Sequence, residues 1–275
     1  QPGWVDFDND GDLDLYVVND YGMHVQPNVL WRNDGIETKT NQWIFTDISN
    51  DSGVDAAILG MGLAVGDYDL DGYFDFFITN IGNQMLFRNT GENLVFEETT
   101  LHAGLEMSKI NYASGVMDRV AWATMFFDYD NDGLEDLYIV SGFLNLHETE
   151  RAFDVPAEMR LQPNVLMRNK GDATFEDKSN KSGADDNGIG RGGFYLDFNL
   201  DGCLDIFITN LDGKAKLFQN TCNDNNWLVI NPVGTISNKD GVGTRIKLTA
   251  NGKTQIREIA AGSSSMSQNM MEAHF

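Results

Sequence analysis

A nine-residue acidic loop that occurs four times constrains this chain more than any other feature. Each copy has a carboxylate or amide side chain at positions 1, 3, 5 and 9 and a glycine at position 6. The copies are loop 1 (Asp6–Asp14), loop 2 (Asp67–Asp75), loop 3 (Asp128–Asp136) and loop 4 (Asp197–Asp205). A repeat of about 60 residues predicts a fold built from repeated supersecondary units.

The spacing within each loop predicts a metal site. Positions 1, 3 and 5 of a tightly curled loop can direct three oxygens at one centre, and glycine at position 6 permits the sharp turn. Position 7 is expected to offer its backbone carbonyl, and its side chain varies accordingly. A set of hard oxygens favours Ca²⁺ over Zn²⁺, and the crowding of carboxylates disfavours Mg²⁺. We therefore predict four calcium sites with these ligands: Asp6, Asp8, Asp10, Asp12, Asp14, Asp67, Asp69, Asp71, Tyr73, Asp75, Asp128, Asp130, Asp132, Leu134, Asp136, Asp197, Asn199, Asp201, Cys203 and Asp205.

The alternative interpretation of these loops is four solvated acidic turns, which the identical spacing of all four copies disfavours. An EF-hand is excluded, because it needs Glu at position 12 and flanking helices. Position 12 here is Val17 or an isoleucine. Loop 4 is expected to bind most weakly, because Asn199 replaces an aspartate and removes one charge.

The segments around the loops read as β-strands. Each loop is followed by a short β-branched and aromatic segment and then by a second strand that ends in Arg-Asn or Gln-Asn. Three copies show a further strand near a Phe-Thr-Asp, Phe-Glu-Glu or Phe-Glu-Asp triplet. Four antiparallel strands in each unit of about 60 residues predict an all-β fold, a β-propeller followed by a small β domain. The expected blades are approximately residues 1–55, 56–110, 111–188 and 189–225, and the β domain is 226–275.

The propeller is expected to be partial, with about three and a half blades. Residues 1–5 leave little room for a first strand, and blade four lacks a last strand before Trp227. The 226–275 domain also reads as incomplete. Open strand edges would pair with missing blades or with neighbouring chains. The alternative is a compact ring of four blades.

The repeats resemble the FG-GAP or VCBS-type calcium repeats of propeller proteins and are similar to the integrin α head. The C-terminal part resembles the ASPIC/UnbV domain through residues 226–230, Gly234, 238–246 and 261–269. Together they indicate the cartilage-acidic-protein-like family. The resemblance implies a calcium-bound propeller outside the cell, secreted, on the cell surface or in the periplasm, that serves adhesion or recognition. It implies no catalytic residues.

Composition narrows the choice of partner. Nineteen Lys and Arg against 42 Asp and Glu give a formal net charge of −23. Such a balance disfavours nucleic acid and anionic membrane surfaces, and no apolar run is long enough for membrane insertion. A protein or glycan ligand is expected instead.

The inserted segments are the expected recognition sites, because loops on a rigid scaffold usually carry binding residues. Blade one has a short insertion and blade three a long one, from Gly142 through Leu161. The alternative for the long one is an ordinary surface loop with a short helix. The candidate ligand contacts in it are His147, Glu148, Glu150, Arg151 and Glu158.

The sequence favours a non-enzymatic protein. It has no nucleophile elbow, zinc-protease motif or phosphate loop, and residues 262–265 read as a turn. Two alternatives remain open: a carbohydrate-active enzyme, lyase or hydrolase, on a calcium-loop propeller, and a structural subunit of an extracellular assembly. The basic residues of the C-terminal strands, Arg245 and Arg257 among them, read as a solvated face.

We predict a disulfide between Cys203 and Cys222. If Asp212-Gly213 is a two-residue hairpin turn, Ile206 faces Gln219 and the two cysteines face each other at the base of the hairpin. The alternative is two free thiols in a cytosolic protein. An oxidising compartment would agree with calcium loops of modest affinity.

Overall fold

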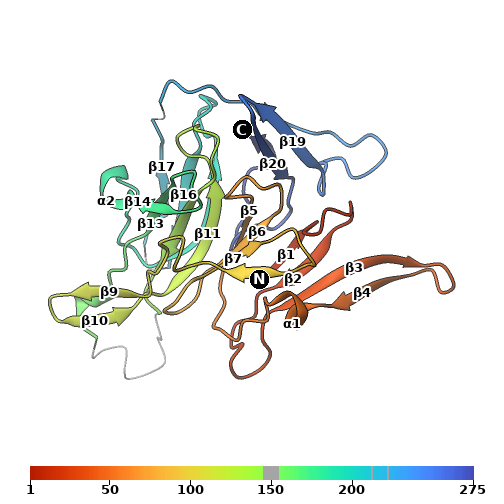
Figure 1. Cartoon of the computed structure of the whole chain (residues 1–275). Helices are drawn as coiled ribbons and strands as arrows, with labels where there is room; N and C mark the ends of the chain where they lie inside the picture. The colour runs from red at the N-terminus through yellow and green to blue at the C-terminus, as the bar shows by residue number, and fades with distance from the viewer. Residues whose placement is uncertain (145–154, 212, 222) are drawn as a thin grey trace.

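The computed structural model describes residues 1–144, 155–211, 213–221 and 223–275 of the chain. It confirms the all-β fold class: three four-stranded antiparallel sheets, one three-stranded sheet and smaller two-stranded pairs (Figure 1). The four larger sheets resemble the blades of a propeller and follow one another along the chain. In the described residues they do not close into a ring.

The strand order within each blade is the order in the chain. Blade one contains β1 (Pro2–Val5), β2 (Asp14–Val17), β3 (Val29–Glu37) and β4 (Gln42–Asp47). Blade two contains β5 (Leu63–Gly66), β6 (Asp75–Ile78), β7 (Met85–Asn89) and β8 (Phe96–Glu98). Blade three contains β11 (Ala121–Phe127), β12 (Asp136–Ser141), β13 (Val165–Asn169) and β14 (Phe175–Asp177). Blade four contains β15 (Gly190–Leu196), β16 (Asp205–Asn210) and β17 (Lys216–Phe218).

Each metal loop joins the first two strands of its blade, as predicted. The first strands of successive blades lie side by side, β1 next to β5, β5 next to β11 and β11 next to β15. The short helices α1 (Ser49–Ser52) and α2 (Ser179–Ser182) follow the fourth strands of blades one and three. None of the helices in the described parts of the chain is long and apolar enough to cross a membrane.

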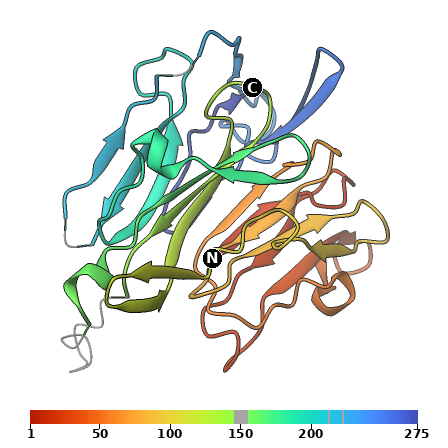
Figure 2. The same ribbon diagram turned by 60° about the vertical axis from the view of Figure 1, so that its left-hand side comes forward.

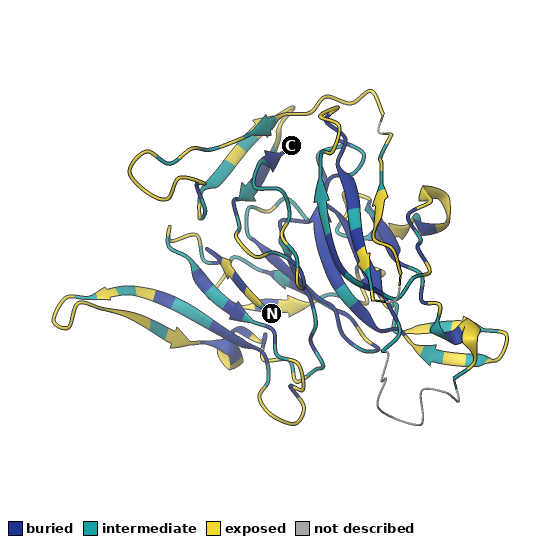
Figure 3. Cartoon of the chain, turned by 180° about the vertical axis from the view of Figure 1, so that it is seen from behind, coloured by how far each residue is buried: buried dark blue, intermediate teal, exposed yellow. Residues whose placement is uncertain are grey.

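The hydrophobic core lies between the blades, where each sheet packs face to face on the next. Tyr16 of blade one stacks on Phe76 of blade two, with ring centroids 4.7 Å apart. Phe127 of blade three stacks on Tyr195 of blade four at 5.8 Å. Figure 3 shows the central strands of blades two and three as largely buried, and every residue of β6 and β12 is buried. Alternate residues of a strand face opposite neighbours, so these strands are apolar on both faces.

The blade count needs one correction. Blade one has all four strands, because Pro2–Val5 forms a strand as long as Leu63–Gly66 of blade two and pairs with Asp14–Val17. Blade four has three strands among the described residues, as predicted. The expectation of a shortened first strand was therefore wrong, because four residues suffice for a strand at this position.

One hairpin was not predicted: β9 (Lys109–Tyr112) and β10 (Gly115–Asp118) precede blade three. The long insertion contains a short 3-10 helix, η2 (Ala157–Arg160), as its alternative interpretation expected. Four of the five candidate ligand contacts in this insertion, His147, Glu148, Glu150 and Arg151, lie outside the described residues.

The C-terminal region is also β. It contains β18 (Val229–Ile230) paired with β21 (Ala273–His274), and β19 (Arg245–Ala250) paired with β20 (Lys253–Glu258). Asn251 and Gly252 form the predicted turn, both with positive φ. Figure 2 shows these strands, in blue, beside the loops at one end of the blades. The domain boundaries at 225 and 226 stay a prediction.

The register argument for the disulfide was wrong. Ile206 pairs with Phe218, one residue before the expected Gln219, because the β16–β17 connection is longer than a two-residue turn. Cys222 lies outside the described residues, so its bond to Cys203 stays a prediction.

Candidate metal centres

All four acidic loops curl in the same way around their first residue. The carboxylate at position 1 accepts a hydrogen bond from the backbone N–H of the glycine at position 6. The donor–acceptor distances are 3.2 Å for Gly11 to Asp6, 3.1 Å for Gly72 to Asp67, 2.8 Å for Gly133 to Asp128 and 2.9 Å for Gly202 to Asp197. These hydrogen bonds are part of the curled shape that calcium ligation needs.

Position 4 is a feature that the sequence reasoning missed. It has a left-handed backbone in every loop, with φ of 63° at Asn9, 60° at Leu70, 53° at Asn131 and 61° at Leu200. Asparagine tolerates this conformation, whereas leucine is strained in it. The alternation of Asn and Leu between the loops was the available signal.

The predicted carboxylate ligands come together in loops 1, 2 and 3. Carboxylate oxygens of three aspartates lie within 4.8 Å of one another in each, at positions 1, 3 and 5 of loops 1 and 2 and at positions 1, 3 and 9 of loop 3. Asp67 Oδ1 and Asp130 Oδ1 are buried without a hydrogen-bond partner among the described residues. Buried carboxylate oxygens with no partner fit a hard cation such as Ca²⁺. The residues present could therefore hold a metal ion.

The aspartate at position 9 has a second role. Asp136 accepts hydrogen bonds from the backbone N–H groups of Tyr129, at 3.1 Å, and Asn169, at 2.8 Å. The other three loops repeat this pair of bonds. Position 9 therefore ties the loop to the third strand of its blade.

Burial makes these carboxylates hard to ionise without a cation. Desolvation raises the pKa of Asp136 to about 9 and the pKa of Asp14 to about 8. It also raises the pKa of Asp67 and of Asp128 to about 7. A bound divalent ion would offset this cost, because it supplies the counter-charge that the buried site lacks.

In blades two and three, an arginine on the third strand forms ion pairs with aspartates of the metal loop in the same blade. Arg168 Nη2 and Nε contact Asp132 and Asp130 of loop 3, each at 2.7 Å. Arg88 contacts Asp69 and Asp71 of loop 2 in the same way. The corresponding residue of blade four is Gln219, so loop 4 lacks this arginine as well as one aspartate. The two differences change the charge around loop 4 in opposite directions, and the weakest binding at loop 4 stays a prediction.

The asparagine of the Arg-Asn or Gln-Asn pair, in or just after the third strand, links blades two, three and four to the preceding blade. Its side-chain Nδ2 donates to the carbonyl at position 2 of the preceding metal loop. The distances are 2.9 Å from Asn89 to Phe7, 2.7 Å from Asn169 to Tyr68 and 2.6 Å from Asn220 to Tyr129. In blade one, Asn33 Nδ2 donates to Leu13 of its own loop. In blades two and three, the two residues of the Arg-Asn pair therefore contact different loops. The arginine pairs with aspartates of the loop in its own blade, and the asparagine bonds to the loop of the preceding blade.

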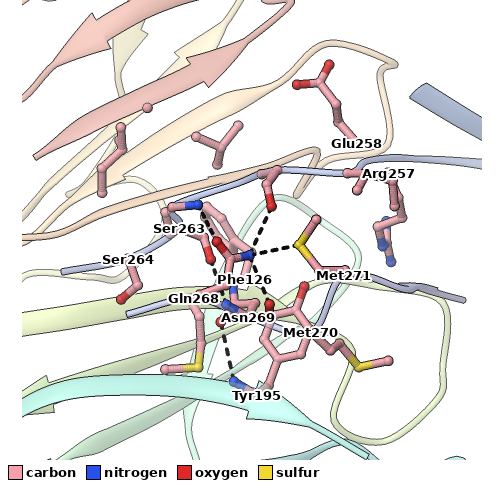
Figure 4. A pocket seen from close by; sticks show the side chains of 18 of the residues that line it. Phe126, Tyr195, Arg257, Glu258, Ser263, Ser264, Gln268, Asn269, Met270 and Met271 are labelled. Carbon is pink, nitrogen blue, oxygen red and sulfur yellow. Dashed lines mark hydrogen bonds between the residues drawn. The ribbon is translucent and has the colours of Figure 1, made fainter. Parts of the chain in front are cut away.

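The C-terminal segment covers a small cavity beside the first strands of the blades. The cavity has a volume of about 100 Å³ (Figure 4). Ser264 Oγ accepts from Thr124 N–H at 2.9 Å, and Asn269 Oδ1 accepts from Tyr195 N–H at 3.3 Å. Ser264, in the stretch predicted as a turn at 262–265, therefore also supplies a hydrogen-bond partner to β11, and Asn269, beyond that stretch, supplies one to β15.

The remaining candidate ligand contact, Glu158, lies on the hairpin side of the molecule. Its Oε1 accepts a hydrogen bond from Ser114 N–H, at 2.9 Å, in the turn between β9 and β10. A groove of about 370 Å³ opens at blade two, between apolar side chains that include Met23 and Leu101 and the carboxylates of Glu98 and Glu106. The groove lies at the ends of the blade-two strands that are away from the metal loops.

Comparisons with known families agree with this architecture. A family described as FG-GAP-like repeat matches residues 6–78 and 128–208, more than half of the chain. A family described as ASPIC and UnbV matches residues 234–275.

Individual relatives are more distant. Cartilage acidic protein 1 of Xenopus tropicalis is 27% identical over 97% of this chain, and that of Homo sapiens is 25% identical over 95%. The chain spans only 38% and 36% of their lengths. A solved structure titled for recognition of non-reducing terminal N-acetylglucosamine by an Agrocybe aegerita lectin aligns at 16% identity with a TM-score of 0.29. The alignment covers 79% of this chain and 65% of that one. That score is too low to bear on the fold.

Proposed function

Because this chain belongs to the family of FG-GAP-like repeat proteins, we propose that it is a non-enzymatic calcium-binding propeller module that recognises a protein or glycan outside the cell. The observation that carries the proposal is the set of carboxylate oxygens within 4.8 Å of one another in loops 1 to 3. Loop 4 curls in the same way and provides a fourth site.

A location outside the cell follows from the metal. Loops of this kind bind calcium with modest affinity, and the calcium concentration outside cells is high enough to fill them. The relatives named cartilage acidic protein 1 support an extracellular setting. A Cys203–Cys222 disulfide would also need an oxidising compartment.

The recognition surface in this proposal lies at the strand ends opposite the metal loops. The C-terminal segment already contacts the metal-loop side, whereas the groove at blade two is open and borders the blade-one insertion. Met23 is 57% exposed and Leu101 is 70% exposed, so the groove offers apolar contact area to a partner.

A second partner surface is the outer face of blade one. In blade two, the rings of Phe76, Phe87 and Phe96 pack on blade one. The same register positions in blade one are occupied by Leu15, Trp31 and Phe45. We propose that a further blade, or a neighbouring chain, covers this face. Sedimentation and tryptophan emission of the chain over a range of concentrations test it. A monomer with unchanged tryptophan emission at every concentration would contradict association through this face.

Calcium titration followed by calorimetry and thermal melting tests the main proposal. We expect four sites filled at millimolar or lower calcium, with a melting temperature that rises as the sites fill. Magnesium at equal concentration is the matched control and should stabilise far less. Equal melting curves in calcium and in excess chelator would refute the proposal.

A further inference from the structure

The C-terminal strands contact all four metal loops. The contacts run from Arg245 to Asp6 in loop 1, from Arg245 to Phe74 in loop 2, from Arg257 to Glu135 in loop 3 and from His274 to Gly202 in loop 4. The basic strand face predicted to be solvated is therefore partly an interface: Arg245 and Arg257 point at the propeller.

Loop 1 is held most closely. The backbone N–H of Asp6 donates to Glu258 Oε2 at 3.4 Å. The backbone carbonyl of Asp6 and the side-chain oxygen of Asn9 both accept hydrogen bonds from the Arg245 guanidinium. The first metal ligand of loop 1 is thus fixed on both sides of its backbone by residues of β19 and β20.

Loop 2 shows what this contact replaces. The backbone N–H of Asp67 donates to Glu135 Oε2 at 2.7 Å, and Glu135 is position 8 of the next loop in the chain. The corresponding position-8 residue for loop 1 is Phe74, which has no acceptor. Glu258 supplies the missing carboxylate from the C-terminal domain. The C-terminal domain therefore gives the position-1 N–H of loop 1 the carboxylate acceptor that loop 3 gives to loop 2.

We propose that the C-terminal domain is a calcium-dependent clamp, which docks on the metal loops in their curled form and raises the calcium affinity of loop 1. This inference rests on the proposed function, because it requires calcium in the loops. It goes beyond that function, because it assigns the ASPIC/UnbV-like domain a regulatory contact with loop 1.

The direction of the coupling follows from the groups contacted. Besides the ion pairs of Arg245 with Asp6 and of Arg257 with Glu135, the clamp meets uncharged groups whose position depends on the curl. These are the N–H and carbonyl of Asp6, the amide of Asn9 and the carbonyl of Gly202. Without a cation, the clustered carboxylates repel one another and open the loop, which separates these contacts. A cation that fixes the curl favours docking, and docking favours the cation by the same factor.

The test uses Arg245→Met, which keeps the aliphatic stem but removes the guanidinium that contacts Asp6, Asn9 and the Phe74 ring. Lys247→Met is the matched control, since Lys247 is an exposed residue two positions along the same strand with no ion pair among the described residues. Calorimetry should show one calcium site weakened about fivefold in the first variant and no site changed in the second. Glu258→Gln should give a smaller loss at the same site.

Hydrogen exchange of the unaltered chain provides the second measurement. Chelation should speed amide exchange in Arg245–Ala250 and Lys253–Glu258. If calcium binds but exchange in these two strands is the same in chelator, or if Arg245→Met and Lys247→Met bind calcium alike, the clamp is refuted and the proposed function stands. If calorimetry detects no calcium binding, the proposed function itself fails and the clamp fails with it.

Discussion

The side-chain amide of Asn169 in blade three donates to the backbone carbonyl of Tyr68 in blade two, at 2.7 Å, although 101 residues separate the two. Asn169 is fully buried. Its Nδ2 also donates to the carbonyl of Glu135, at 3.0 Å. One side chain therefore satisfies two buried carbonyls from different blades, and it also lies directly beside the metal loop of its own blade.

Replacing Asn169 with alanine should destabilise the chain by about 2 kcal/mol, because two buried carbonyls lose their partner. The matched control is Asn33→Ala, which removes the same residue type from a blade without the cross-blade bond and should cost less. Urea unfolding of both variants in calcium measures the difference. Equal losses would mean that the bond between blades contributes nothing beyond the local contacts.

Replacing Leu200 with asparagine should stabilise the chain by about 1 kcal/mol, because the left-handed backbone at this position strains leucine. Leu200 is 82% exposed, so little packing is lost. Loops 1 and 3 already have asparagine there. Thermal melting should show a rise of about 2 °C. Leu211→Asn, at an exposed leucine without positive φ, serves as the control and should not raise the melting temperature.

Calcium binding should release protons at neutral pH. Burial raises the pKa of Asp67 and Asp128 to about 7 and the pKa of Asp136 to about 9. These carboxyls are therefore partly protonated in the calcium-free fold, and the ion must displace the protons. Apparent calcium affinity should rise from pH 6 to pH 8.

Calorimetry in two buffers with different ionisation enthalpies measures this release at pH 7. The observed binding heat should differ between the buffers in proportion to the number of protons released. A binding heat that is independent of the buffer would show that the loops are fully ionised before calcium arrives.

Reduction should destabilise the chain by about 3 kcal/mol if Cys203 and Cys222 form a disulfide, because the bridge closes a loop of about 20 residues. Titration of thiols in the denatured, unreduced chain checks the bond directly and should find none. Two free thiols would exclude it. Cys203→Ser with Cys222→Ser should reproduce the effect of reduction and should not respond to reductant.

The sequence was sufficient for the repeat, the loops and the blade class, because each depends on local spacing that recurs four times. The glycine of each loop lies where the pattern required, whereas among the described residues the aspartate at position 9 joins the carboxylate cluster only in loop 3. The sequence was not sufficient for the bond from Asn169 to Tyr68, since nothing in an Arg-Asn dipeptide shows which distant carbonyl it meets.

The sequence pattern also did not predict the strand register of blade four or the docking of the C-terminal strands on the metal loops. The pairing of Ile206 with Phe218 depends on the length of a connection that reads as a two-residue turn in the sequence. Arg245 and Arg257 looked solvated because alternation along a strand predicts one outward face, and only the three-dimensional arrangement shows that this face meets the metal loops. The φ of Leu200 follows from the curl of the loop and contradicts the preference of leucine.

The bond from each blade to the preceding one also sets an order of events during synthesis. The carbonyl of Phe7 gains its hydrogen-bond donor only when Asn89 is in place. The carbonyls of Tyr68 and Tyr129 likewise depend on Asn169 and Asn220. Because the donor always comes later in the chain, no blade can complete its polar contacts until the ribosome has delivered most of the next one. A nascent chain therefore always exposes one unfinished blade at its growing end, and it is this blade that a chaperone would have to shield.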